Sequence, residues 1–208
     1  HLQFVKNRDT RQRNVEMWAN VDKDMACTFA DNLGVERPKN SNVSESRTSP
    51  AISMANTTYS AATQKVGILI GNDFNSKEVK GIMDMLNNNG VFFDIISERL
   101  GPVTGDNGEQ LDVGETFKTK APVLYDAIYV VGGKATNQAE FDQKIMEFCR
   151  EIYKHNKPIG AATTGQAYIE QSKFNNTTGV VGAVNNNNFG DDFINAIAQK
   201  RFWDRVLH

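Results

Sequence analysis

The chain has 208 residues, of which 39% are hydrophobic and 23% are charged, and its formal net charge is −2. This composition excludes the disordered class, and no stretch reaches the roughly 18 unbroken apolar residues that a membrane helix needs. The near-neutral charge gives no indication of a nucleic-acid surface. We therefore expect one main globular domain with an extension, and neither nucleic acid nor a membrane as its partner.

The first predicted element is a single amphipathic helix over residues 14–34. Apolar side chains recur there at intervals of three and four residues, and Gly34 provides a stop signal. The members of this apolar stripe are Val15, Trp18, Val21, Met25, Phe29 and Leu33. The following residues 37–64 are polar, rich in Ser, Thr and Asn and without periodicity, which predicts a linker.

From Lys65 onward, strand and helix signals alternate. The apolar runs predict strands, and the stretches with helical spacing between them predict helices. The predicted strands are 65–70, 91–97, 124–131, 157–162 and 178–184. The predicted helices are 76–90, 136–155, 164–174 and 191–207, and residues 101–113 are predicted to form a hairpin. This alternation predicts an α/β fold with a doubly wound, mostly parallel sheet and helices on both faces.

In such sheets, ligands bind in loops at the carboxyl ends of the strands, which directs attention to the loops after residues 70, 131 and 162. The first loop lacks the glycine spacing and the lysine of phosphate-binding motifs, so we expect no dinucleotide or flavin. Gly132 and Gly133 fit either an oxyanion pocket or a tight turn. Glu78, one turn into the helix after the first strand, is either a solvated acid or a hydrogen-bond partner of the turn at Thr163.

The turn at Thr163 and Thr164 joins a strand to a helix, where many α/β enzymes place a nucleophile. A hydroxyl there needs a base, usually histidine. His155 precedes a strand and is therefore expected at the wrong edge of the sheet, while His1 and His208 are the ends of the chain. Cys27 and Cys149 have neither metal-ligand nor redox spacing. We therefore expect no catalytic residue and no metal site.

Three segments of the chain resemble the class I glutamine amidotransferase-like superfamily, which includes the PfpI-type proteases and deglycases. These segments are residues 65–97, 124–133 and 157–165. In that superfamily a helix glutamate faces a cysteine on the strand-to-helix turn. The resemblance places the glutamate at Glu78 and the cysteine at Thr163, so both the thiol and the histidine that should follow it are absent. It implies a flavodoxin-like fold with a degenerate site made of Glu78, Gly132, Gly133, Thr163 and Thr164.

A closer resemblance covers nearly the whole chain and is to the C-terminal part of large-subunit (clade 2) haem catalases. It is carried by residues 17–39, 49–70, 96–117, 153–162 and 201–205. It implies that residues 1–36 are the end of the helical region of a catalase core, 37–64 a linker and 65–208 the flavodoxin-like domain. The haem-binding motifs of the family do not occur in this chain, so no cofactor is expected here, and the haem would lie in the catalase core.

The resemblance implies a non-catalytic module of a catalase that decomposes hydrogen peroxide to water and oxygen. The module would contribute stability and tetramer assembly, with the catalase core and the other subunits of a homotetramer as its partners. A second hypothesis is a chaperone of the holdase type that binds unfolded clients through apolar residues of the helix 14–34 and of the linker, including Ile52, Met54 and Tyr59. A residual small-ligand or hydrolase site at Glu78, Gly132, Gly133 and Thr163 is the third.

Overall fold

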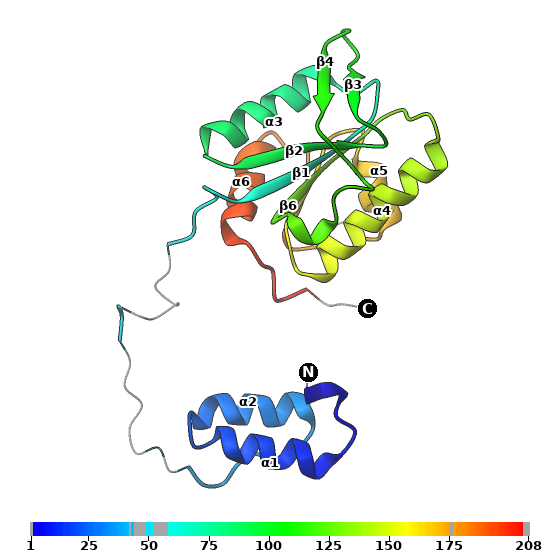
Figure 1. Cartoon of the computed structure of the whole chain (residues 1–208). Coiled ribbons are helices and arrows are strands. Elements are labelled where there is room, and N and C mark those ends of the chain that lie inside the picture. The colour runs from blue at the N-terminus through cyan, green and yellow to red at the C-terminus, as the bar shows by residue number, and fades with distance from the viewer. Residues whose placement is uncertain (1, 42, 44–48, 52–57, 175–176, 206–208) are drawn as a thin grey trace. The chain divides into compact units, whose positions relative to one another are not determined.

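The computed structural model describes residues 2–41, 43, 49–51, 58–174 and 177–205 (Figure 1). The chain divides into two compact units, His1–Thr57 and Thr58–His208. The first unit is helical, and the second contains every strand that the structure describes. Between residues 37 and 64, the described residues form neither helix nor strand, and Ile52 and Met54 lie outside the described residues.

The N-terminal unit contains two helices where the sequence analysis predicts one. After a short 3-10 helix, Leu2–Phe4, come α1 (Arg8–Trp18) and α2 (Lys23–Leu33). The prediction of a continuous helix over 14–34 is wrong because Asp22 takes an extended backbone conformation and caps α2. Its carboxylate accepts a hydrogen bond from the Met25 amide at 2.8 Å.

The break between the helices also changes which side chains are buried. The two helices pack through a seam of mostly small residues: Val15, Ala19, Ala26, Ala30 and Leu33. Trp18 and Phe29 pack edge to face at 6.2 Å against this seam, whereas Val21 is 61% exposed. Only some side chains of the predicted apolar stripe are therefore exposed to solvent.

The C-terminal unit is built on a six-stranded sheet in the order β5-β2-β1-β6-β7-β8, with every neighbouring pair parallel. The strands are β1 (Lys65–Ile70), β2 (Phe92–Ser97), β5 (Glu115–Thr116), β6 (Ala127–Gly132), β7 (Ile159–Ala161) and β8 (Val180–Gly182). Without the two-residue edge strand β5, the order is that of flavodoxin-like folds. The predicted doubly wound α/β fold is confirmed.

Four helices cover the two faces of this sheet (Figure 1). They are α3 (Ser76–Asn88), α4 (Gln138–Lys154), α5 (Gln166–Gln171) and α6 (Phe189–Gln199). Ile68 and Tyr129 face α3 and α6, while Leu69 and Ile128 face α4 and α5. Because successive residues of a strand point to opposite faces, the unbroken apolar runs supply both cores at once.

Two further elements lie outside the sheet. The predicted hairpin is present as β3 (Gly101–Thr104) and β4 (Gln110–Val113), and the 3-10 helix η3 (Pro122–Leu124) precedes β6.

The closing helix is shorter than the predicted 191–207, because α6 ends at Gln199 and Lys200 adopts a left-handed conformation with φ of +67°. The chain then turns back, and the Phe202 amide donates to the Asn156 carbonyl at 2.9 Å.

Candidate functional site

The carboxyl edge of the sheet, where the parallel strands end, is the expected ligand site of this fold class. The strand order reverses between β1 and β6, and a ligand would lie in the crevice between the loops that follow them. Here the two loops are hydrogen-bonded to each other. The Gly71 amide donates to the Gly132 carbonyl, and Asn72 and Lys134 exchange two backbone hydrogen bonds, each at 2.7 Å. Backbone atoms therefore bridge the crevice.

Gly132 and Gly133 contribute to this closure. Both have positive φ, +74° and +118°, which favours glycine. A Cβ on Gly132 would lie 2.7 Å from the ring of Tyr168, and one on Gly133 would lie 2.5 Å from the Asn72 carbonyl oxygen. The two glycines therefore allow close contact with the protein's own atoms. This favours the tight turn over the oxyanion pocket.

Glu78 and Thr163 are in direct contact at the same edge. Asn75 caps α3 by accepting a hydrogen bond from the Glu78 amide at 2.9 Å. The Glu78 side chain reaches across to the turn after β7, where Oε1 accepts from the Thr163 amide at 2.9 Å and from its hydroxyl at 3.3 Å. Of the two alternatives for Glu78, a solvated acid or a hydrogen-bond partner of the turn, the structure contains the hydrogen bonds to the turn.

Thr164 faces the interior of the turn, and its hydroxyl donates to the Val131 carbonyl at 2.7 Å. All five residues predicted for the degenerate site therefore lie at one edge of the sheet, either in contact with one another or beside each other in the chain. A role for them as a remnant of a catalytic site stays a prediction.

The chemistry available around Thr163 is limited. Within the described part of the chain, its hydroxyl is hydrogen-bonded to the Glu78 carboxylate alone, and a carboxylate is a weak base for an alcohol. His155 ends α4 at the opposite edge, where its Nε2 lies 3.8 Å from Glu151. Burial and the charge of Glu78 raise the pKa of the Tyr129 hydroxyl, which keeps it neutral. His1 and His208 lie outside the described residues.

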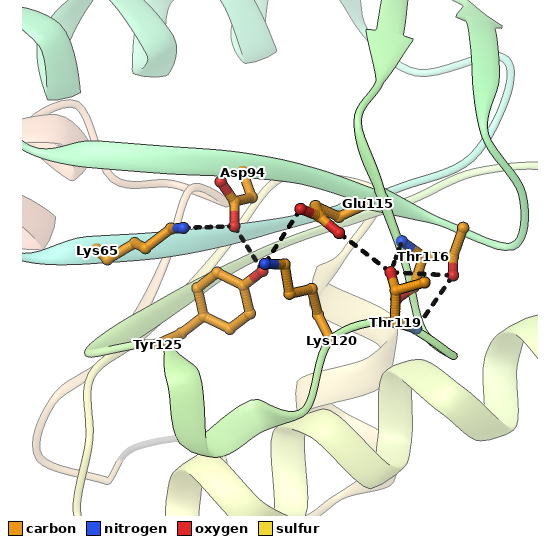
Figure 2. Close-up of polar contacts among 7 residues, drawn as sticks. All are labelled: Lys65, Asp94, Glu115, Thr116, Thr119, Lys120 and Tyr125. Carbon is orange, nitrogen blue, oxygen red and sulfur yellow. Dashed lines mark hydrogen bonds and ion pairs between the residues drawn. The ribbon is translucent and has the colours of Figure 1, made fainter.

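A second polar cluster was not predicted from the sequence. Figure 2 shows it on the α4 side of the sheet, beside β2 and the edge strand β5. The Asp94 carboxylate forms an ion pair with Lys65 at 2.7 Å and accepts a hydrogen bond from the Tyr125 hydroxyl at 2.8 Å. The signal in the sequence was Asp94 itself, a carboxylate inside an apolar strand. Its partners lie about 30 residues away in either direction and could not be chosen without the fold.

The same cluster continues to the edge strand. Glu115 pairs with Lys120 at 3.1 Å and accepts a hydrogen bond from the Thr119 hydroxyl at 3.1 Å (Figure 2). Burial raises the pKa of Asp94, but the hydrogen bonds from Lys65 and Tyr125 outweigh it and lower the pKa below its ordinary value. Burial and the bond to Asp94 raise the pKa of Tyr125. Because opposite charges neutralise each other within the cluster, it fits a structural network rather than a site for a substrate.

Neither a metal nor a membrane is indicated by the described part of the chain. Its Asp, Glu, His and Cys side chains nowhere gather into a group of three or more that could hold a metal ion. Among the helices that are described, none is both long enough and apolar enough to cross a membrane. The Cys149 thiol is buried, and burial raises its pKa to about 12.

Comparison with known proteins gives a consistent result. The family described as the C-terminal domain found in long catalases matches residues 62–207. Catalase-2 of Bacillus subtilis (strain 168) is 39% identical over 210 residues, covering 98% of this chain and 30% of the catalase. Catalase HPII of Pseudomonas aeruginosa is 30% identical over 208 residues, covering 98% of this chain and 29% of the catalase.

A more distant similarity joins part of the chain to a different group of proteins. Deglycase PfpI of Pyrococcus furiosus is 28% identical over 101 residues, which cover 49% of this chain and 61% of the deglycase. With the catalases, the match extends over almost the whole chain. The chain spans only about 30% of the length of the catalases that it matches.

Proposed function

The chain belongs to the family of C-terminal domains found in long catalases, and from this premise we propose that it is a non-catalytic module of a larger catalase. The parent protein would decompose hydrogen peroxide to water and oxygen with a haem held in its core, outside this chain. The module would contribute to the stability of the parent and to assembly of a homotetramer. Its partners would be the catalase core and neighbouring subunits.

The observation that carries this proposal is the closed carboxyl edge. The crevice between β1 and β6 is bridged by backbone hydrogen bonds, and the position for a nucleophile holds Thr163, whose hydroxyl has no histidine partner among the described residues. A residual hydrolase site would need an activated nucleophile, and a small-ligand site would need an open crevice. A module without catalytic activity can still stabilise the parent protein. An interface that is buried only in the native state shifts the folding equilibrium towards that state.

Deletion of the module from a long catalase tests the proposal. A parent that ends before the residue equivalent to Ala62 should have a lower thermal midpoint and a smaller tetrameric fraction by size exclusion with light scattering. Peroxide turnover per assembled haem should be retained. Unchanged midpoint and assembly in the truncated parent would refute the proposal.

A second candidate function is that of a holdase, and one observation favours it. Three large apolar side chains of the N-terminal unit are more than half exposed: Phe4 is 83%, Met17 57% and Val21 61% exposed. Such residues can bind the apolar segments of unfolding proteins. Light scattering of a heated client enzyme tests this candidate function. The chain should suppress aggregation of the client, and a variant that combines Phe4→Ser, Met17→Ser and Val21→Ser should lose this effect.

A further inference from the structure

A hollow of about 330 Å³ opens at the amino edge of the sheet, where the parallel strands begin. It is lined by η3, by the end of α4 and the loop before β7, and by the segment after α6. The residues that matter here are Val123, Lys154, Asn156, Lys157, Arg201 and Trp203. We refer to the hollow that these residues line as the amino-edge hollow. It lies at the opposite edge of the sheet from Glu78 and Thr163, and nothing in the proposed function uses it.

The amino-edge hollow is positively charged. Lys154, Lys157 and Arg201 line it, and no carboxylate does so among the described residues. Arg201 forms no ion pair within the described part of the chain, and the nearest carboxylate to Lys154 is that of Glu151 at 3.9 Å. Lys157 is buried and its ammonium donates to the Val123 and Tyr125 carbonyls, so Lys154 and Arg201 are the cationic groups that a ligand in the hollow can reach. Burial and then the charge of Arg201 lower the pKa of Lys157, and the charge of Asp126 acts in the opposite direction.

The hollow also presents apolar surface to solvent. Trp203 is 78% exposed and Val123 is 69% exposed, although both are large apolar side chains. Trp203 is held in this position by its neighbours, since Phe202 is buried and Arg205 is anchored to the Lys157 carbonyl at 2.8 Å. A tryptophan fixed beside cationic groups is the composition typical of protein-binding hot spots.

The apolar surface indicates the kind of anion. Trp203 and Val123 lie at the hollow beside the cationic groups, and both are exposed. An inorganic anion would meet the cations but offer nothing to these two side chains, whereas an apolar side chain of a peptide covers them.

We propose that the amino-edge hollow is a docking site for an acidic peptide segment with an apolar side chain. The carboxylates of the segment lie against Lys154 and Arg201, and its apolar side chain covers Trp203 and Val123. The site does not depend on the proposed role in a catalase, because its recognition chemistry is complete within this chain.

Selection from a random peptide display library on the immobilised 208-residue chain tests this proposal. Selected sequences should combine aspartate or glutamate with an aromatic or aliphatic residue. Two of them are then titrated against a Trp18→Phe variant, in which Trp203 is the remaining tryptophan and reports binding by fluorescence. Arg201→Glu and Lys154→Glu should each weaken binding by at least about tenfold, because they place like charges against the peptide.

Matched variants separate this site from the general charge of the protein. Lys77→Glu makes the same charge change on the exposed surface of α3 and should leave the affinity unchanged. A chain that carries Trp203→Ala should no longer bind the selected peptides in the display experiment. Failure to select any peptide, selection of sequences without acidic residues, or affinity that is insensitive to Arg201→Glu would overturn the proposal. So would displacement of the peptide by equimolar inorganic phosphate or a single-stranded oligonucleotide, which would indicate a site for simple anions or nucleic acid.

Discussion

The two edges of the sheet differ in a way that reverses the expectation for this fold class. At the carboxyl edge, where α/β enzymes bind their ligands, the crevice between β1 and β6 is bridged by hydrogen bonds between the loops that follow these strands. The amino edge has an open, cationic hollow with an exposed tryptophan. The difference teaches that the edge at which this fold class binds its ligands can be bridged by the protein's own backbone while a hollow opens at the other edge.

The largest effect is expected at the tightest point of the carboxyl edge. A Cβ at Gly165 would collide with the Val130 carbonyl oxygen, a backbone atom of β6. Gly165→Ala should therefore lower the free energy of unfolding by about 4 kcal/mol, measured by urea denaturation. Gly114→Ala is the control, because a Cβ there meets no atom within 4 Å, and it should change stability by less than about 0.5 kcal/mol. Similar values for the two variants would show that the carboxyl edge is not tightly packed.

At the amino edge, Arg205 should have the largest role in stability. It is 6% exposed and donates to the carbonyls of Thr178 at 2.7 Å and Lys157 at 2.8 Å. Burial lowers its pKa to about 10. Arg205→Ala should reduce the free energy of unfolding by about 3 kcal/mol, because the carbonyls lose their donor and a void remains.

Arg201→Ala is the matched control for that variant. Among the described residues, the Arg201 side chain makes one hydrogen bond, to the Lys200 carbonyl, and it lines the hollow instead of filling the interior. Its removal should change the unfolding free energy by less than about 0.5 kcal/mol. If Arg201 contributed as much as Arg205, the hollow would be a structural feature and the distinction between a packed interior and an available surface would not hold.

A smaller effect is expected in the network of Figure 2. Tyr125→Phe removes the hydrogen bond to Asp94 and leaves the ion pair with Lys65. Because the acceptor is charged, we expect a loss of about 1.5 kcal/mol in the free energy of unfolding. In a double-mutant cycle with Asp94→Asn, the two losses should add up to more than the loss in the double variant. Simple additivity would show that the two groups do not interact.

The smallest effect concerns acid and should be confined to the carboxyl edge. Hydrogen bonds from the amide and side chain of Ser76 lower the pKa of Asp106, which lies beside the start of α3. A carboxylate with a lowered folded-state pKa contributes stability above its unfolded value, and this contribution is lost as the pH falls below about 4. The protection of amides at the start of α3 against hydrogen exchange, relative to their intrinsic rates at each pH, should therefore fall in acid. In Asp106→Asn this protection should change less with pH, and an equal fall in this variant would contradict the assignment.

Most of the C-terminal unit could be predicted because its signals are local. The run at residues 65–70 is apolar at nearly every position, which indicates a strand buried on both faces. The end of α6 could not be predicted, because Lys200 takes a left-handed conformation that sequences usually mark with glycine. The break before Asp22 was missed because Val21 fits the helical spacing although it is exposed.

The site was predicted unevenly for a similar reason. The chain order placed Glu78 and Thr163 at one edge, so their contact could be expected from topology. The Asp94 network and the amino-edge hollow combine side chains from distant segments, and only the packed structure brings Lys157 and Arg201 together. The backbone bridge between Asn72 and Lys134 carries no side-chain signal and was beyond sequence analysis.

The central claim is that the Glu78–Thr163 contact is retained as structure and not as a reactive site. The direction in which Glu78→Ala changes the free energy of unfolding tests this claim. Polar residues of working active sites commonly reduce stability, so their removal commonly increases it. Our account predicts a decrease of about 1 kcal/mol in urea denaturation, because the Thr163 amide and hydroxyl lose their acceptor. An increase in the stability of this variant would contradict the account.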